Sequence, residues 1–371
     1  MALRHGFEPR KQVLETRRLT IGNRSKLSFF RLAGRPLSEY RTKKDSMRTF
    51  ERSNRRTLDA SLQEGMFDAE YDYYTRHNRY PVMLMGKPII NIYKRINLQV
   101  VLTEACPMRC GFCIERIDDV GTELDVTELF GAVLAQYGSQ GVAPNVSITG
   151  GEPTLYPNRL KGALDACRSN GIRNVNINTY GHSWDVLSQY PEVRVNLSRH
   201  AVAPSPRDPV FMMPAPADHI DGRTFIQCAL LRDHIHTLPG MKVFMQQWMA
   251  RTPPLAGFSF RGLSQLDDAK AYPEEQRLFC SSQCVDIFEI ANQMFADPEF
   301  HFQQQKIGDH YWFEFYRWGS IPIRLTYSNF SYLRRREQEE RARDEWLSRA
   351  TVVHANGHVY AGWAYDINKV A

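Results

Sequence analysis

Short apolar runs alternate with longer amphipathic stretches between residues 96 and 263. The first run, Ile96–Thr103, is rich in β-branched residues, and residues 124–138 follow it with apolar side chains at helical spacing. One face of that helix would carry Val126, Leu129, Phe130, Val133, Leu134 and Tyr137. Five more apolar runs occur at residues 145–153, 173–181, 193–199, 223–231 and 257–263, with helical stretches at 160–169 and 238–250. The pattern predicts six strands connected by helices.

Strands that alternate with helices in units of about 30 residues indicate βαβ crossovers, which place the strands in parallel. Six such strands are too few for a closed eight-unit barrel. We therefore predict an α/β fold in which residues 91–263 form a curved, open partial (βα)6 barrel.

The rhythm changes after residue 263, and we predict an α+β region over residues 264–371 that covers the barrel. Residues 284–295 suit a helix. Residues 311–318 and 321–327 suit a hairpin around Gly319-Ser320, and residues 351–363 suit a second hairpin around Asn356-Gly357. Residues 334–350 alternate acidic and basic side chains, which is typical of a helix with a solvated face.

The first 90 residues show no long periodicity, and we predict a basic N-terminal extension that packs only in part on the barrel. Residues 1–60 hold 16 Lys and Arg against 6 Asp and Glu, although the whole chain carries a net charge of only +6. The basic residues cluster at Arg17-Arg18, at Arg41 with Lys43-Lys44, and at Arg52 with Arg55-Arg56. Such an arm is either a solvated extension or a segment that contacts phosphates.

Two features of the chain bear on its location. No apolar run approaches the roughly 18 residues that a membrane-spanning helix needs, and the N-terminus lacks the apolar core of a secretory signal. We therefore expect a cytoplasmic protein without membrane contact. Thiols stay reduced there, so clustered cysteines indicate a metal site more often than a disulfide.

Three of the seven cysteines lie close together directly after the first predicted strand, at Cys106, Cys110 and Cys113. A zinc site with three cysteines usually adds a nearby histidine, and none lies between Ile114 and His182. A ferredoxin would supply a fourth cysteine. Three thiolates can instead hold three irons of a [4Fe–4S] cluster and leave the fourth iron open to a substrate or cofactor.

A second motif, Gly150-Gly151-Glu152-Pro153, ends the second predicted strand. Glycines let a backbone approach a ligand closely, and a carboxylate can accept a charge-assisted hydrogen bond from an ammonium group. The alternative is a tight strand-to-helix turn with a solvated glutamate.

The two motifs resemble those of the radical S-adenosylmethionine superfamily, whose hallmark is C-x-x-x-C-x-x-C after the first strand of a partial barrel. Within it, residues 96–263 are most similar to molybdenum-cofactor cyclases and peptide maturases. The resemblance implies a [4Fe–4S] cluster on the three cysteines and S-adenosylmethionine on the open iron. It also implies reductive cleavage to methionine and a 5′-deoxyadenosyl radical, with a reductant such as flavodoxin or ferredoxin.

The resemblance also implies which residues surround the cofactor. They are Phe112, Gly150, Gly151, Glu152, Pro153, Asn178, Ser198 and Arg199. Tyr180 departs from the family pattern, because an asparagine is commoner at that place. His200 suits either a structural or a functional role.

Several questions stay open at this point. The substrate is a nucleic acid or nucleotide, which the basic arm weakly favours, or a peptide or small natural product; a degenerate cluster protein that only binds is the non-enzymatic alternative. Glu104, Gln227 and Arg261 could point into the barrel, although structural roles are commoner. Cys228, Cys280 and Cys284 could hold an auxiliary cluster, which we do not expect, because Cys228 lies in an apolar strand where buried free cysteines are common.

Overall fold

One twelve-stranded sheet forms the centre of the computed structural model, which describes residues 48–57, 59, 63–108, 110–114, 123–200, 220–251 and 255–371. Its middle consists of six parallel strands in chain order. They are β4 (Asn97–Val101), β5 (Asn145–Thr149), β6 (Val175–Thr179), β7 (Arg194–Ser198), β8 (Thr224–Ala229) and β9 (Gly257–Arg261). All six lie within the predicted runs, so the α/β class and the large parallel sheet are confirmed.

Further strands extend both edges of this parallel array. Next to β9 comes β12 (Ile321–Ser328), which is parallel to it, and then β11 (Tyr311–Trp318), β10 (Phe300–Ile307) and β1 (Arg48–Phe50) in antiparallel order. Next to β4 comes the parallel β14 (Thr351–His354), followed by the antiparallel β15 (His358–Tyr360). Both predicted hairpins are confirmed, and each turns at a glycine with positive φ, Gly319 and Gly357.

The two faces of the parallel strands differ in chemistry. Side chains alternate between the faces of a strand, and one face of β4, β5 and β6 carries Leu98, Val100, Val146, Ile148 and Ile177, all buried. The opposite face carries amides and hydroxyls. Its members on the same strands are Asn97, Gln99, Asn145, Ser147, Asn176 and Asn178.

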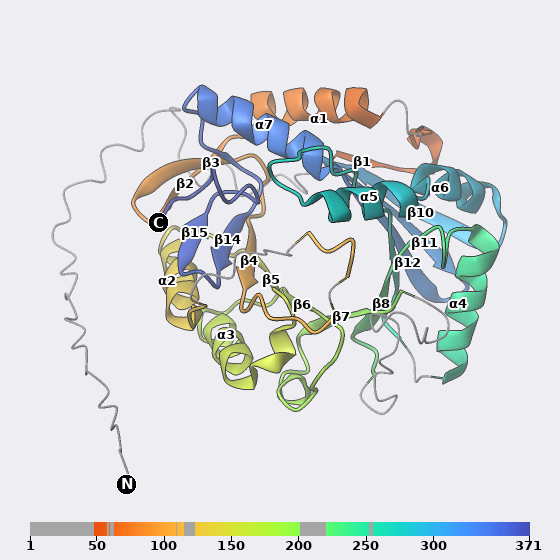
Figure 1. The fold of residues 1–371 in the computed structure, drawn as a ribbon, viewed down its shortest axis with the longest axis horizontal. Helices are drawn as coiled ribbons and strands as arrows, with labels where there is room; N and C mark the ends of the chain where they lie inside the picture. Colours follow the sequence, from red (N-terminus) through yellow and green to blue (C-terminus); the bar gives the residue numbers. More distant parts are fainter. Residues whose placement is uncertain are drawn as a thin grey trace, which may run out of the picture. The chain divides into compact units, whose positions relative to one another are not determined.

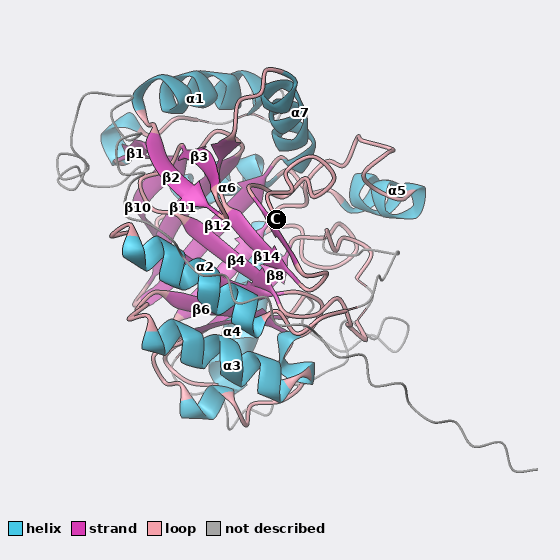
Figure 2. Ribbon diagram, turned by 90° about the vertical axis from the view of Figure 1, so that its left-hand side faces the viewer, coloured by secondary structure: helices cyan, strands magenta, loops and turns pink. Residues whose placement is uncertain are grey.

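Helices cover the apolar face, as Figures 1 and 2 show for α2 (Thr127–Ser139), α3 (Pro157–Ser169) and α4 (Leu238–Arg251). Helix α2 buries the predicted side chains Phe130, Val133, Leu134 and Tyr137. Full burial of one such side chain contributes roughly 1.5–3 kcal/mol. The apolar stripe is therefore enough to hold the helix on the sheet, while the polar face of the sheet is left for another purpose.

Residues 63–91 are more regular than the sequence pattern predicted. They form α1 (Gln63–His77) and the hairpin of β2 (Tyr80–Leu84) and β3 (Lys87–Asn91), which pairs with β13 (Leu347–Ser348). Helix α1 buries Phe67 and Tyr74 but also Glu70, which pairs with two arginines. That carboxylate interrupts the apolar stripe by which the helix could have been predicted.

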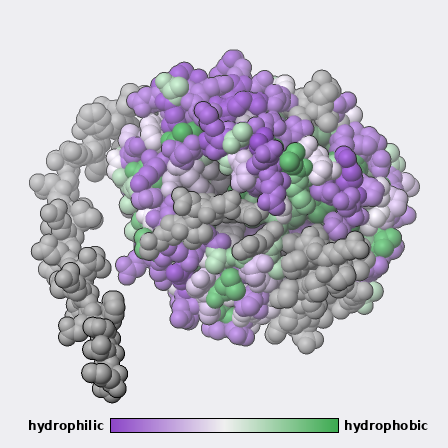
Figure 3. Space-filling model, viewed as in Figure 1, coloured by the Kyte–Doolittle hydropathy of each residue, from purple (hydrophilic) through white to green (hydrophobic). Residues whose placement is uncertain are grey.

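The charged helix α7 (Phe330–Ala342) has the expected solvated face, on which Arg335, Gln338 and Glu339 are exposed, but it ends before the predicted residue 350. It lies beside α1 (Figure 2), and Phe67 of α1 packs against Tyr332 with ring centroids 5.7 Å apart. The surface over α1 and α7 is hydrophilic in Figure 3. Nevertheless Glu337 and Glu340 of α7 are fully buried, because each finds donors inside the protein.

Two further helices, α5 (Glu274–Gln283) and α6 (Ile287–Ala296), precede β10, and α6 confirms the helix predicted there. The division at residues 90 and 263 stays a prediction. Strands β12 and β14 from the last segment nevertheless join the same sheet as β4 and β9. None of the described helices combines the length and the apolar character needed to cross a bilayer.

Candidate functional site

The polar face of the sheet borders a cavity of about 570 Å³. The cavity is lined by residues of β4 to β9, of the cysteine loop, of the start of β11 and of the segment after β15. In Figure 1 the strands curve around this region. The asparagines and serines of the inner face therefore border a space large enough for ligands instead of a packed core.

Cys106, Cys110 and Cys113 all lie on the cavity wall as partly buried thiols. Among the described residues, no three His, Cys, Asp or Glu side chains converge on a point that one metal ion could occupy. A four-iron cluster needs no such convergence, because each cysteine binds a different iron. Three thiols that face one cavity thus fit a cluster better than they fit a single zinc ion.

Helix α5, which follows the last parallel strand in the chain, contacts the cysteine loop. The Gln276 side chain donates to the Cys113 carbonyl oxygen. The Phe279 ring lies so close to Gly111 that a Cβ there would be 2.6 Å from it. Phe112 packs edge-on against His200, with ring centroids 4.9 Å apart, and against Phe279. The spacing of the cysteines could not have predicted these contacts, because α5 lies about 160 residues further along the chain.

The two glycines of the second motif contact the chain itself. A Cβ on Gly150, whose φ is +134°, would lie 2.3 Å from the Thr103 carbonyl oxygen, and one on Gly151 would lie 2.2 Å from that of Ala105. Gly151 N–H donates to Thr103 at 2.6 Å, and Glu152 N–H donates to Ala105 at 2.9 Å. The motif therefore fastens the backbone that leads directly into Cys106.

The Glu152 side chain is buried, so the alternative of a solvated glutamate is wrong. Its Oε1 accepts hydrogen bonds from the amide and hydroxyl of Thr154, at 3.0 and 2.6 Å, and from the Thr179 hydroxyl. Its Oε2 accepts one from Tyr180 N–H at 2.8 Å. A carboxylate has about four acceptor positions, so Oε2 alone keeps capacity for a ligand on the cavity side.

Six of the eight predicted cofactor-binding residues line the cavity, and Pro153 and Arg199 do not. Asn178 accepts from the Asn196 amide at 3.0 Å, which fixes the orientation of the Asn178 side chain on the wall. Arg199 is buried behind the wall, and its Nη1 donates to the carbonyl oxygens of Tyr180 and Ser198.

Arg199 holds a charge close to the cavity wall. Its Nε and Nη2 are buried and have no hydrogen-bond partner among the described residues. Burial lowers the pKa of Arg199 to about 10, and Glu152 opposes that shift. The guanidinium remains charged at neutral pH. Its two unsatisfied donors are buried and Arg199 is not on the cavity wall, so its influence on the cavity is that of a nearby positive charge.

Of the side chains that could point into the barrel, some line the cavity and others do not. Gln227 and Arg261 line the cavity, whereas Glu104 lies 3.5 Å from His354 and is not on the wall. His200 accepts from Ala229 N–H at 3.0 Å, and burial lowers its pKa to about 3, so it stays neutral and supports the Phe112 ring. Cys280 lies on the wall and Cys228 is buried within β8.

Part of the basic arm is used inside the protein. Arg55 pairs with Glu314 at 2.8 Å, and Arg56 pairs with Glu70 at 3.4 Å. The Arg52 guanidinium lies over the Phe295 ring at 4.8 Å. This cluster is therefore committed to intramolecular contacts, and the clusters at residues 17–18 and 41–44 lie outside the described residues.

The cavity residues that were not foreseen from the sequence include four ring-bearing side chains, which are His310, Tyr311, Phe313 and Trp363. They come from the segments before and within β11 and after β15, which carry no motif. Only their aromatic content could have drawn attention to them.

Comparison with known proteins addresses the chemistry of this site. Residues 100–211, which include the cysteine loop and the Gly-Gly-Glu-Pro turn, match the model of the radical SAM superfamily. Residues 100–211 therefore carry a radical SAM domain. Such a domain implies a [4Fe–4S] cluster and S-adenosylmethionine as cofactors, and the three thiols on the cavity wall fit that cluster.

Curated relatives match the same region. A probable GTP 3′,8-cyclase of Sulfolobus acidocaldarius is 31% identical over 113 residues, which are 29% of this chain and 35% of the relative. The GTP 3′,8-cyclase of Actinobacillus succinogenes is 33% identical over 108 residues, which are 28% of this chain and 32% of the relative. The chain thus spans about a third of the length of these curated relatives.

Among solved structures, Streptococcus suis SuiB bound to its precursor peptide SuiA is similar at 18% identity and a TM-score of 0.37. That match covers 53% of this chain and 43% of SuiB.

Proposed function

We propose that this radical SAM protein reductively cleaves S-adenosylmethionine and modifies a nucleotide-type substrate inside the cavity. Bound together, the cluster and S-adenosylmethionine supply a 5′-deoxyadenosyl radical that abstracts hydrogen from a substrate carbon. The observation that carries the proposal is that Cys106, Cys110 and Cys113 line the same cavity as Gly150, Gly151 and Glu152.

The chain's own residues have separable roles in this proposal. The three cysteines hold the cluster, and the contacts of Gly151 and Glu152 with Thr103 and Ala105 keep the cysteine loop at the end of β4. Phe112 borders the cofactor, and the buried guanidinium of Arg199 supplies a positive charge behind Ser198. Strands β4 to β9 act as a partial barrel around the reactants.

The nucleotide preference rests on the chemistry of the cavity wall. The amides of Asn97, Gln99, Asn145 and Asn176 offer donors and acceptors of the kind that pair with the edge of a nucleobase. Arg261 adds a positive charge to the wall. A reductant such as flavodoxin or ferredoxin would supply the electron, and the cytoplasm would keep the thiols reduced.

The test has two parts, both under strict anaerobiosis. Reconstituted protein should carry about four irons and release 5′-deoxyadenosine from S-adenosylmethionine after reduction. The variant with Cys106, Cys110 and Cys113 all changed to Ala should lose both properties, whereas Cys167→Ala, outside the cavity, should keep them. Undiminished iron in the triple variant contradicts the cluster assignment. Absence of 5′-deoxyadenosine from the wild type favours a protein that only binds.

A further inference from the structure

The cavity wall contributed by the C-terminal region contains one histidine, His310, in the turn between β10 and β11. Tyr311 pairs with Ser328, the last residue of β12, so the turn lies beside the end of that strand. The His310 ring packs against Tyr311 and Trp363, with centroid distances of 4.4 and 5.7 Å. Trp363 in turn donates to Gln99 of β4 at 3.1 Å. His310 is therefore held between the two extended edges of the sheet.

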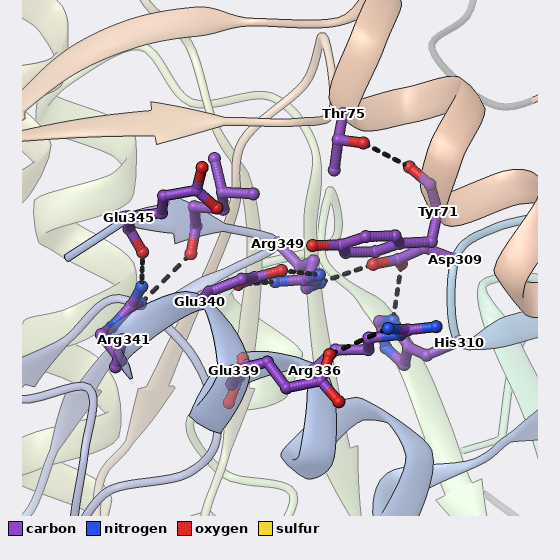
Figure 4. A network of polar contacts seen from close by, with 12 residues as sticks. Tyr71, Thr75, Asp309, His310, Arg336, Glu339, Glu340, Arg341, Glu345 and Arg349 are labelled. Atoms are coloured by element: carbon purple, nitrogen blue, oxygen red, sulfur yellow. Dashed lines mark hydrogen bonds and ion pairs between the residues drawn. The ribbon is translucent and has the colours of Figure 1, made fainter. Parts of the chain in front are cut away.

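A buried charge network fixes the residue next to it (Figure 4). The Asp309 carboxylate accepts from Arg349 Nε at 2.5 Å and from the Tyr93 hydroxyl. Arg349 makes a bidentate contact with Glu340, at 2.8 and 2.7 Å. Burial would raise the pKa of Asp309, but Arg349 and His310 outweigh that effect and hold it well below its usual range. Asp309 is thus a fixed carboxylate.

That carboxylate determines the protonation of the imidazole. His310 Nδ1 lies 2.8 Å from Asp309 Oδ1, and an ionised carboxylate can only accept, so the proton resides on Nδ1. Burial lowers the pKa of His310 even though Asp309 opposes the shift. The ring is then neutral, and its Nε2 carries a lone pair. The bond to Asp309 uses Nδ1, which leaves Nε2 as the ring nitrogen that can accept from a ligand.

We propose that His310 Nε2 is a substrate-binding acceptor that receives an N–H of a nucleobase, whose ring lies against Tyr311, Phe313 and Trp363. Aromatic side chains stack on nucleobases with useful affinity, and Tyr311 and Phe313 lie with ring centroids 5.4 Å apart on the same wall. Asp309 and Arg349 are positioning residues, because they act through the imidazole. The inference rests on the proposed function and adds the residue that contacts the base.

Binding of GTP to the unreduced full-length protein, measured by calorimetry, provides the first test. His310→Asn keeps a donor toward Asp309 but removes the acceptor at Nε2, so it should weaken GTP binding roughly 3- to 10-fold. His310→Gln places a carboxamide near the Nε2 position and should recover most of the affinity. His301→Asn, at an exposed site on β10, is the matched control.

The outcomes separate the possibilities. Wild-type affinity in His310→Asn, or an equal loss in the Asn and Gln variants, overturns the role of Nε2. Absence of GTP binding by the wild type overturns the nucleobase assignment. Because no reductant is present, none of these results bears on 5′-deoxyadenosine release, which tests the proposed function separately.

A measurement on the wild type keeps the proposal testable if the variants fail to fold. Diethyl pyrocarbonate acylates neutral imidazole nitrogens, and peptide mass spectrometry shows which histidine has reacted. His310 should react in the free protein and be protected by saturating GTP, whereas His301 should react equally in both states. Unreactive His310, or reaction that GTP does not slow, would overturn the proposal.

Discussion

The cysteine loop and the wall around His310 face the same cavity, but different forces hold them in place. Main-chain contacts fasten the loop, because Gly150 and Gly151 lie against the carbonyl oxygens of Thr103 and Ala105. Side-chain charges fasten the other wall, where Arg349 joins Asp309 to Glu340. Added side-chain volume should therefore destabilise the loop, and loss of a charge should destabilise the wall around His310.

The largest expected effect is on stability, through the Arg349 network next to the wall around His310. Arg349→Met removes the cation shared by two buried carboxylates, and breaking a buried ion pair in this way costs about 3–5 kcal/mol. Chemical denaturation should show this loss. Arg343→Met removes an exposed partner of Glu345 and should change the free energy of unfolding by less than about 1 kcal/mol. Equal effects of the two changes would mean that burial of the network is not what stabilises this wall.

The pH dependence of stability tests Glu337, a buried acid whose pKa is influenced by Arg349 and Glu340. Burial raises the pKa of Glu337 to about 7 from an ordinary value of 4.5. The folded state therefore prefers the protonated form, and this contribution is full below pH 4.5 and is lost as the pH rises through 7. Glu337→Gln should remove a pH-dependent contribution to the free energy of unfolding of about 3 kcal/mol between these pH values. An unchanged pH profile of the free energy of unfolding would contradict the raised pKa.

The stability of the cysteine loop should depend on the space around the Gly151 backbone. Gly151→Ala would push a methyl group against the Ala105 backbone, so we expect a loss of roughly 1–3 kcal/mol, together with reduced iron content after reconstitution. Gly138→Ala is the control: its Cβ would meet nothing within 4 Å, and helix propensity makes the change neutral or stabilising. Full iron loading of Gly151→Ala would show that the loop does not depend on this close approach.

The smallest effect concerns the contact between α5 and the loop. Gln276→Leu removes the hydrogen bond to the Cys113 carbonyl, a change of about 1 kcal/mol. The global unfolding temperature should move little, whereas the absorbance of the reconstituted cluster should decay faster in air than in the wild type. The exposed change Gln303→Leu is its control. Equal decay rates would assign no protective role to α5.

Local patterns determined the parallel core and the chemistry of the cysteine loop. The apolar positions of β4 to β9 repeat every second residue, so the strands could be predicted from single runs of sequence. Cys106, Cys110 and Cys113 lie within eight residues, and the Gly150–Pro153 turn follows at the end of the next strand, so the resemblance to radical SAM proteins could be recognised without knowledge of the fold.

Long-range packing decided the rest. The partners of Glu70, Glu337 and Glu340 come from distant segments, so the charge pattern of α1 and α7 could not show which acids are buried. Asp309 and Arg349 are 40 residues apart, and only the folded sheet brings its two extended edges close enough for them to pair. Sequence determines which residues can fold into a strand or bind a cluster; tertiary structure determines which charges meet, because that depends on contacts between segments with no local pattern in common.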